Sequence, residues 1–166
     1  MSIIINPRGT SGSGKTEFVR RLLSDYGWGG GGSVEPVRRE GRLRPIAYRL
    51  RHPCQGGRPL VVLGHYEVTS GGCDTIRAVD GGMDEVFRLA GGYASSGHDV
   101  LLEGLMLSGE HERSTALAQT RRLHVLRLST PLDRCIRNVI ARRRAGRNAW
   151  ASIARKAMLQ HADRKS

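Results

Sequence analysis

The sequence lacks the features that direct a chain to a membrane or out of the cell. No stretch of about 18 apolar residues occurs, which excludes a membrane-spanning helix. Residues 1–7 show no basic stretch followed by a long apolar one, so no secretory signal is expected. The three cysteines form no C-x-x-C pair, which argues against a disulfide framework and a zinc site. We therefore expect a protein of the reducing cytoplasm.

Acidic residues are few. The chain has 27 basic and 15 acidic residues and a net charge of +12. Only Lys15, Lys156 and Lys165 are lysine, and the other basic residues are arginine. The base composition of a genome can explain arginine in place of lysine, but it does not explain the excess of positive charge. The excess favours a polyanionic partner, either nucleic acid or nucleotide phosphates.

The length of 166 residues and the apolar fraction of 39% predict a single domain over 1–166. No internal repeat is found. The 22 glycines predict sharp turns, and the segment 27–33 (GWGGGGS) predicts a flexible loop.

Short apolar runs alternate with segments of helical spacing along the chain. Strands are expected at 3–5, 46–51, 60–63, 99–103 and 123–128. Helices are expected at 17–26, 83–94, 110–119, 131–144 and 150–161. This alternation predicts an α/β fold with a mostly parallel sheet and helices on both faces. Ligands of such folds bind beyond the carboxyl ends of the strands.

A phosphate-binding loop follows the first expected strand. Residues 9–16 (GTSGSGKT) match the Walker A pattern G-x-x-x-x-G-K-[ST], between a strand and a helix as this motif requires. Backbone N–H groups and the helix N-terminus favour an anion there, Lys15 reaches the β- and γ-phosphates, and the Thr16 hydroxyl binds magnesium. The motif predicts a P-loop NTPase fold that binds ATP and Mg²⁺. Its expected binding residues are Gly9, Ser11, Gly12, Ser13, Gly14, Lys15 and Thr16.

Two acids follow expected strands and are candidates for chemistry. Asp74, in a glycine-rich segment after strand 60–63, could accept or orient an acceptor alcohol, or could instead cap the short helix that follows it. Glu103 ends strand 99–103 and could support magnesium or position a nucleophile, or could pair with an arginine. His65 and Tyr66 could touch the acceptor, with the Tyr66 ring stacking on a base, although a lone histidine is more often structural.

Arginines crowd the region 134–148, where an arginine-bearing lid could close over the triphosphate. Arg143 is the candidate for catalysis, and it shares a helical face with Arg147. The alternative is a solvated helix face, which some of these arginines must form. A second cluster comprises Arg38, Arg39, Arg42, Arg44, Arg49, Arg51 and Arg58. A nucleotide could not occupy both clusters, whereas a nucleic-acid strand could.

Three segments resemble the small P-loop kinases of the nucleotide-kinase-like group: GTSGSGKT, VLLEG and LRLSTPLDRCIRNVIARRRAGR. More narrowly, VLGHYEVTSGGCDTI and LLEGLMLSGE are similar to small kinases of tailed bacteriophages, some of which are 5-hydroxymethyluracil DNA kinases. The resemblance implies that Asp74 activates the hydroxymethyl oxygen of a modified thymine, that Glu103 supports the metal or the acceptor, and that arginines hold DNA phosphates. It also implies the cytoplasm of an infected host.

The leading hypothesis is therefore an ATP- and magnesium-dependent kinase acting on 5-hydroxymethyluracil in DNA. One alternative is a kinase of nucleoside monophosphates or small alcohols. The absence of a separate monophosphate-binding domain in the sequence weakens it. Another alternative is a nucleic-acid-stimulated ATPase or binding module. No second ATPase signature supports it.

Overall fold

The computed structural model describes residues 1–166 except 30–31, 68–70 and 144–166. The chain forms two compact units. The larger comprises Met1–Asn6 and Thr16–Leu126, and the smaller comprises Pro7–Lys15 and Arg127–Ser166. The helix expected at 150–161 lies outside the described residues, as does part of the expected glycine-rich loop 27–33.

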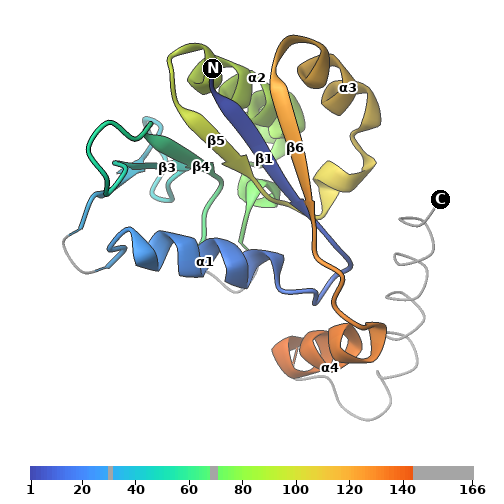
Figure 1. Ribbon diagram of the computed structural model, residues 1–166. Helices are drawn as coiled ribbons and strands as arrows, with labels where there is room; N and C mark the ends of the chain where they lie inside the picture. The colour runs from blue at the N-terminus through green and yellow to red at the C-terminus, as the bar shows by residue number, and fades with distance from the viewer. Residues whose placement is uncertain (30–31, 68–70, 144–166) are drawn as a thin grey trace. The chain divides into compact units, whose positions relative to one another are not determined.

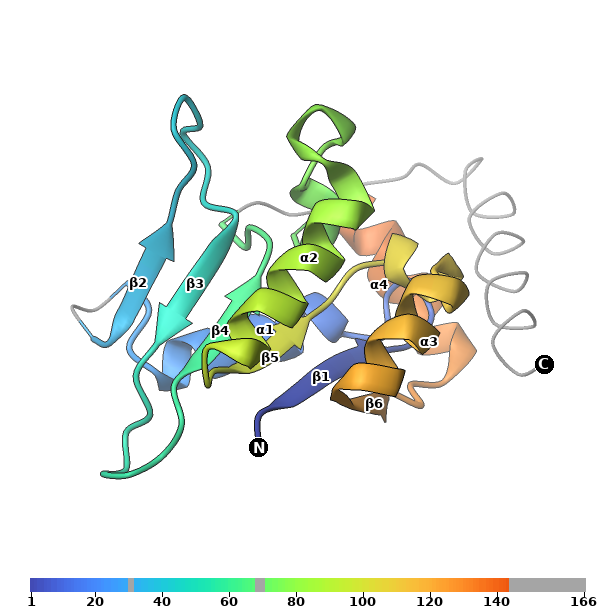
Figure 2. The same cartoon turned by 90° about the horizontal axis from the view of Figure 1, so that it is seen from above.

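A six-stranded sheet forms the centre of the larger unit, with the strand order β2-β3-β4-β5-β1-β6 (Figure 2). The strands are β1 (Ile3–Arg8), β2 (Val34–Val37), β3 (Ala47–Leu50), β4 (Leu60–Leu63), β5 (Asp99–Leu102) and β6 (Arg122–Arg127). β5 pairs in parallel with both β4 and β1, with Val100 opposite Val61 on one side and Ile4 on the other. The carboxyl ends of β4 and β5 therefore meet at one edge of the sheet.

The prediction of a mostly parallel sheet is correct for the centre and wrong for one side. β3 pairs antiparallel with both β2 and β4, so the sheet is mixed. The residues between β3 and β4 connect the two strands as an antiparallel hairpin. β2 was not expected, because Pro36 interrupts its short pattern. Proline lacks an N–H and is tolerated on an edge strand, which is the position of β2.

Helices cover both faces of this sheet, as predicted (Figures 1 and 2). The helices of the larger unit are α1 (Lys15–Asp25, of which Lys15 belongs to the smaller unit), α2 (Gly82–Ser95) and α3 (His111–Thr120). α1 packs on one face, where Val19 and Leu23 are fully buried with Tyr48 and Val62. α2 and α3 cover the other face through a second apolar cluster that includes Val86. Burial on both faces explains why the central strands have continuous apolar sequences.

The smaller unit holds the phosphate loop and the helix α4 (Leu132–Arg143). Ile136 is buried in a small apolar cluster with Leu132 and Ile140, which form the apolar stripe of α4. Helical spacing of these residues agrees with the predicted helix as far as Arg143.

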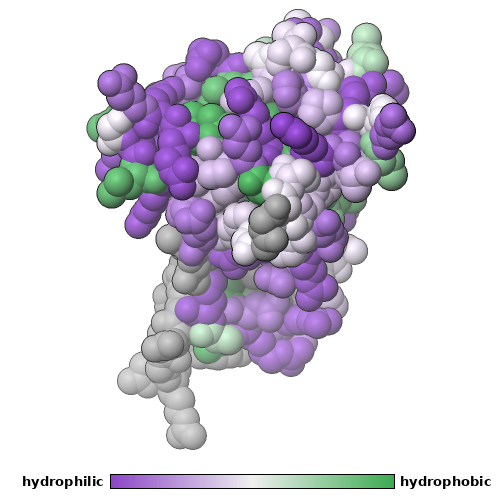
Figure 3. All heavy atoms as spheres, turned by 90° about the vertical axis from the view of Figure 1, so that its left-hand side faces the viewer, coloured by the Kyte–Doolittle hydropathy of each residue, from purple (hydrophilic) through white to green (hydrophobic). Residues whose placement is uncertain are grey.

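The surface on the side of the antiparallel strands is mostly hydrophilic, with small separate hydrophobic groups (Figure 3). Among the described residues, no helix is both long and apolar enough to cross a membrane.

Candidate active site

The phosphate loop connects β1 to α1 and makes two turns that need glycine. Gly12 and Gly14 have φ values of 85° and 95°, in the left-handed region that other residues rarely adopt. Lys15 is buried, and its ammonium group donates to the carbonyl oxygens of Gly9 (2.7 Å) and Thr10 (3.3 Å). Gly9 also needs to be small, since a Cβ there would lie 2.5 Å from Ser13 Oγ. The loop thus folds closely around the lysine.

Helix α4 packs directly against this loop within the smaller unit. Asn138 Nδ2 donates to the carbonyl oxygen of Gly12 at 2.8 Å, and a Cβ on Gly12 would overlap the carbonyl oxygen of Cys135. Just before the helix, Thr130 Oγ1 donates to the carbonyl oxygen of Ser13 at 2.9 Å. These polar contacts fix the loop from one side. Asn138 and Thr130 were not among the sequence candidates.

Among the described side chains of α4, that of Arg142 reaches the loop, and its guanidinium lies 3.4 Å from Ser11 Oγ. The sequence candidate Arg143 ends the helix and its side chain lies outside the described residues, as do Arg144 and Arg147. Arg137 forms an ion pair with Asp133 on the exposed surface. This arginine therefore fits the alternative of a solvated helix face. Cys135, Asn138, Val139 and Arg142 follow helical spacing, and this pattern is the signal that could have identified the loop-facing side.

In the larger unit, Glu103 lies beside Thr16, the last residue of the motif. The Glu103 side chain is 3% exposed, and its Oε2 is 3.4 Å from the hydroxyl of Thr16. Gly72 has a φ of 96°, and a Cβ there would lie 2.6 Å from the same carboxylate oxygen. Two adjacent oxygen donors, a hydroxyl and a carboxylate, fit the ligand preference of Mg²⁺.

Asp74 lies in a 3₁₀ turn, η1 (Cys73–Thr75), and binds the segment that follows Glu103. Its two carboxylate oxygens accept the N–H groups of Leu105 (2.7 Å) and Met106 (3.1 Å). The expected alternative, a cap on a short helix that begins after Asp74, is wrong, because Asp74 lies inside η1 and the chain is extended at Ile76. Instead, Asp74 joins the loops that follow the neighbouring strands β4 and β5. A backbone bond from Cys73 N–H to the carbonyl oxygen of Glu103 (2.6 Å) joins the same two loops.

His65 and Tyr66 are both buried, so neither offers a surface to an acceptor. Tyr66 is fully buried, and its hydroxyl donates to the carbonyl oxygen of Leu63 at 3.3 Å. The predicted stacking of its ring on a base is therefore wrong for this structure. His65 Nδ1 lies 3.3 Å from the hydroxyl of Tyr48, and burial lowers the pKa of His65, which favours its neutral form. These observations favour a structural role for His65 over contact with the acceptor.

Several arginines of the cluster 38–58 form ion pairs with acidic residues of the same chain. Arg39 pairs with Glu85, Arg42 pairs with Asp80 at 2.9 Å, and Arg58 pairs with Asp99 at 3.1 Å. Arg42 also donates to the carbonyl oxygen of Thr75 at 2.6 Å, in the turn that carries Asp74. The cluster is thus only partly available to an external polyanion.

Comparison with known proteins found a relative in Pseudomonas phage PaMx11. It is a 5-hmdU DNA kinase, 43% identical over 141 residues, which cover 84% of this chain and 69% of the relative. No family model and no solved structure matches the chain. Identity at this level over most of both proteins establishes common ancestry, and the phosphate loop and the two carboxylates agree with kinase chemistry. The chain is a phosphotransferase that belongs to the family of phage 5-hmdU DNA kinases.

Proposed function

We propose that the chain transfers the γ-phosphoryl group of ATP to the hydroxymethyl oxygen of 5-hydroxymethyluracil in DNA. The observation that carries the proposal is the 43% identity to a 5-hmdU DNA kinase. The strand, glycine-rich loop and helix at residues 3–25 support a P-loop NTPase fold. The net charge of +12 supports a polyanionic acceptor.

ATP binds to the phosphate loop in this proposal. The glycine-rich turns direct N–H groups toward the β- and γ-phosphates, and Lys15 exchanges the carbonyl oxygens of Gly9 and Thr10 for phosphate oxygens. Arg142 lies within reach of Ser11 in the same loop, so it is the best-supported arginine for stabilising charge on the transferred group. Arg143 remains a candidate for the same role.

The oxygens of Thr16 and Glu103 would hold Mg²⁺, directly or through water. Bound there, the ion would neutralise charge on the phosphates. Among the described residues, no cluster of three or more His, Cys, Asp or Glu side chains could hold a metal. Two oxygen donors suffice for Mg²⁺ in kinases, since the nucleotide and water supply its remaining ligands.

Asp74 is proposed to orient the hydroxymethyl group. The hydroxymethyl oxygen attacks the γ-phosphorus, the bond to the β,γ-bridging oxygen breaks, ADP leaves, and the hydroxyl proton passes to the Asp74 carboxylate. Each oxygen of Asp74 accepts one backbone N–H and retains a second lone pair. A carboxylate already bonded to two donors is a weaker base, and a loose phosphoryl transition state needs little base assistance. Orientation is therefore its principal contribution.

The target base must leave the stack before its hydroxymethyl group can enter the site. The enzyme would act on single-stranded DNA or on a base flipped out of a duplex. A mismatched or unpaired target would then react faster than a paired one, because less stacking energy is given up.

The test is transfer of labelled γ-phosphate from ATP to DNA containing 5-hydroxymethyluracil, with thymine-containing DNA as control. Labelled modified DNA, identified by mass spectrometry, is the expected product, and Lys15→Ala should abolish transfer without unfolding the protein. Label in a free nucleoside monophosphate, or ATP hydrolysis without a phosphorylated product, would replace the proposal by one of its alternatives. Asp74→Asn should slow transfer by about 10² to 10⁴ if the carboxylate takes part in proton transfer.

A further inference from the structure

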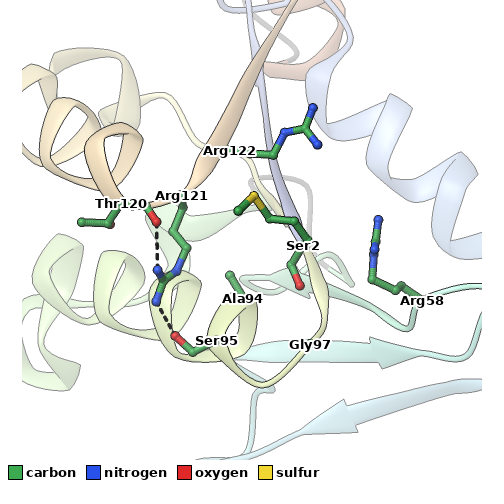
Figure 4. A pocket seen from close by; sticks show the side chains of 9 residues that line it. Ser2, Arg58, Ala94, Ser95, Gly97, Thr120, Arg121 and Arg122 are labelled. Carbon is green, nitrogen blue, oxygen red and sulfur yellow. Dashed lines mark hydrogen bonds between the residues drawn. The ribbon is translucent and has the colours of Figure 1, made fainter.

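A pocket of about 510 Å³ lies in the larger unit, at the amino ends of β1, β5 and β6 (Figure 4). Its lining includes Ser2, Arg58, Ala94, Ser95, Arg121 and Arg122. It lies at the opposite end of β5 from Glu103. β5 has four residues, so about 10 to 13 Å of strand separates the two. The pocket is therefore separate from the candidate catalytic carboxylates.

Positive charge dominates the pocket. Three arginines line it, and no acidic residue is among the lining residues. Arg58 and Arg121 lie on opposite sides, with Ser2 and Ala94 between them (Figure 4). Asp99 neutralises part of the charge of Arg58 through an ion pair of 3.1 Å. The charges of Arg121 and Arg122 remain for a ligand.

Arg121 is held in place for binding. Its guanidinium donates to Ser95 Oγ (2.5 Å) and to the carbonyl oxygen of Thr120 (2.8 Å). Its buried Nε has no hydrogen-bond partner among the described residues. A buried N–H without an acceptor is energetically unfavourable. Arg122 is exposed beside it and makes no ion pair within the described chain.

We propose that this pocket binds a backbone phosphate of the DNA substrate, several nucleotides from the base that is phosphorylated. Arginine presents a planar set of donors that matches phosphate oxygens. The pocket and Glu103 lie at opposite ends of β5, so a ligand that occupies both must follow the surface around the sheet, which a strand of DNA can do. The inference rests on the proposed function for its choice of DNA, while the pocket itself does not depend on the phosphoryl transfer.

The test compares the wild type with Arg121→Gln/Arg122→Gln. The control is Arg88→Gln/Arg113→Gln, which removes the same charge from arginines of α2 and α3 that are outside the pocket. Binding of a labelled single-stranded oligonucleotide is measured by anisotropy over a range of salt concentrations. Loss of the one phosphate bound by Arg121 and Arg122 should make the negative slope of log K against log salt shallower by about 0.7. Both KM for DNA and Kd should rise several-fold in the pocket variant, with kcat and KM for ATP unchanged.

Arg122→Gln alone serves as a second variant, because an exposed side chain can be changed without disturbing the fold. It should reduce the magnitude of the slope by less than the double variant does, because Arg121 remains. Unchanged slopes in both variants, or an equal change in the control, would overturn the inference. Weaker binding of thymidine monophosphate with an unchanged DNA slope would show a nucleotide site instead. Binding is measured with unmodified DNA and without ATP, so a failure of phosphoryl transfer would leave this result intact and would count only against the proposed function.

Discussion

Asp74 and Glu103 are equivalent in the sequence, where each is an acid after an apolar strand. The structure separates their roles. Glu103 is buried, with its Oε2 3.4 Å from the hydroxyl of Thr16, which agrees with its proposed role in holding Mg²⁺. Asp74 holds two backbone N–H groups of the loop that follows Glu103, so it fixes the arrangement of both loops. No local signal in the sequence distinguishes these environments.

Gly104→Ala should displace the Asp74 carboxylate. A Cβ at this position would lie 2.6 Å from Asp74 Oδ1, and the bonds to Leu105 and Met106 would weaken. We expect the free energy of unfolding to fall by about 1 to 3 kcal/mol, and phosphoryl transfer to slow to a similar extent as in Asp74→Asn. Calorimetry and single-turnover transfer measure these two effects. Wild-type rates in Gly104→Ala would show that the position of Asp74 does not matter.

Glu103→Gln keeps the size of the side chain and removes its charge. Since the carboxylate is proposed to support Mg²⁺, we expect the Mg²⁺ concentration for half-maximal transfer to rise by about tenfold or more. Titration of activity with Mg²⁺ at saturating ATP measures it. A lower rate with an unchanged Mg²⁺ requirement would instead assign Glu103 to the acceptor.

Helix α4 was predicted as an arginine-bearing element, and the structure shows that it also braces the phosphate loop. Its contacts come from Asn138, Arg142 and the backbone at Cys135, as well as from Thr130 just before it. Helical spacing predicts which residues share a face, but not what that face meets. From the sequence, Arg143 was chosen over Arg142 because it shares a helical face with Arg147.

Gly12→Ala and Gly14→Ala form a matched pair that tests this packing. Both residues have positive φ, so alanine costs about 1 to 2 kcal/mol at either position. Only at Gly12 would the Cβ meet the backbone of α4, whereas nothing lies within 4 Å at Gly14. Gly12→Ala should therefore lower the thermal unfolding temperature more than Gly14→Ala, measured without nucleotide. Equal decreases would show that α4 does not pack on the loop in solution.

The segment between β2 and β3 stabilises the turn that carries Asp74. Arg42 and Arg77 both pair with Asp80, but their side chains are 11% and 71% exposed. Arg42→Gln should destabilise the protein by about 2 to 4 kcal/mol, because it breaks a mostly buried pair. Arg77→Gln should cost less than about 1 kcal/mol, since solvent screens an exposed pair. Urea unfolding of both variants measures the difference. Similar decreases in the free energy of unfolding would contradict the stabilising role of Arg42.

Over the whole molecule, buried titratable groups set a pH range of greatest stability. Burial raises the pKa of Tyr48 from 10.0 to about 12, so the unfolded chain releases this proton first and stability falls between about pH 10 and 12. Burial lowers the pKa of His65 from 6.5, so the unfolded chain takes up a proton first and stability falls as the pH drops below about 6.5. Each pKa unit corresponds to about 1.4 kcal/mol.

Urea unfolding across pH should therefore give a plateau between about pH 7 and 9, because burial also raises the pKa of the Cys73 and Cys135 thiols above their ordinary value of 9.0. Tyr48→Phe should reduce the alkaline decrease in stability, to which Tyr66 and Cys73 also contribute because burial raises the pKa of both, and His65→Gln should reduce the acidic one. An alkaline decrease of unchanged size in Tyr48→Phe would assign the effect to other groups.

The sequence by itself determined the strand, glycine-rich loop and helix at residues 3–25, the α/β class, the helices on both faces and the relation to DNA kinases. These depend on local features: glycine spacing, apolar periodicity and short motifs whose chemistry requires their residues in order. The tertiary structure decided what depends on neighbours distant in sequence. It paired β3 antiparallel, placed the proline-containing β2 at an edge, buried Tyr66, and used arginines of the cluster 38–58 in internal ion pairs. Burial and strand pairing depend on contacts between residues distant in sequence, so local sequence patterns do not predict them.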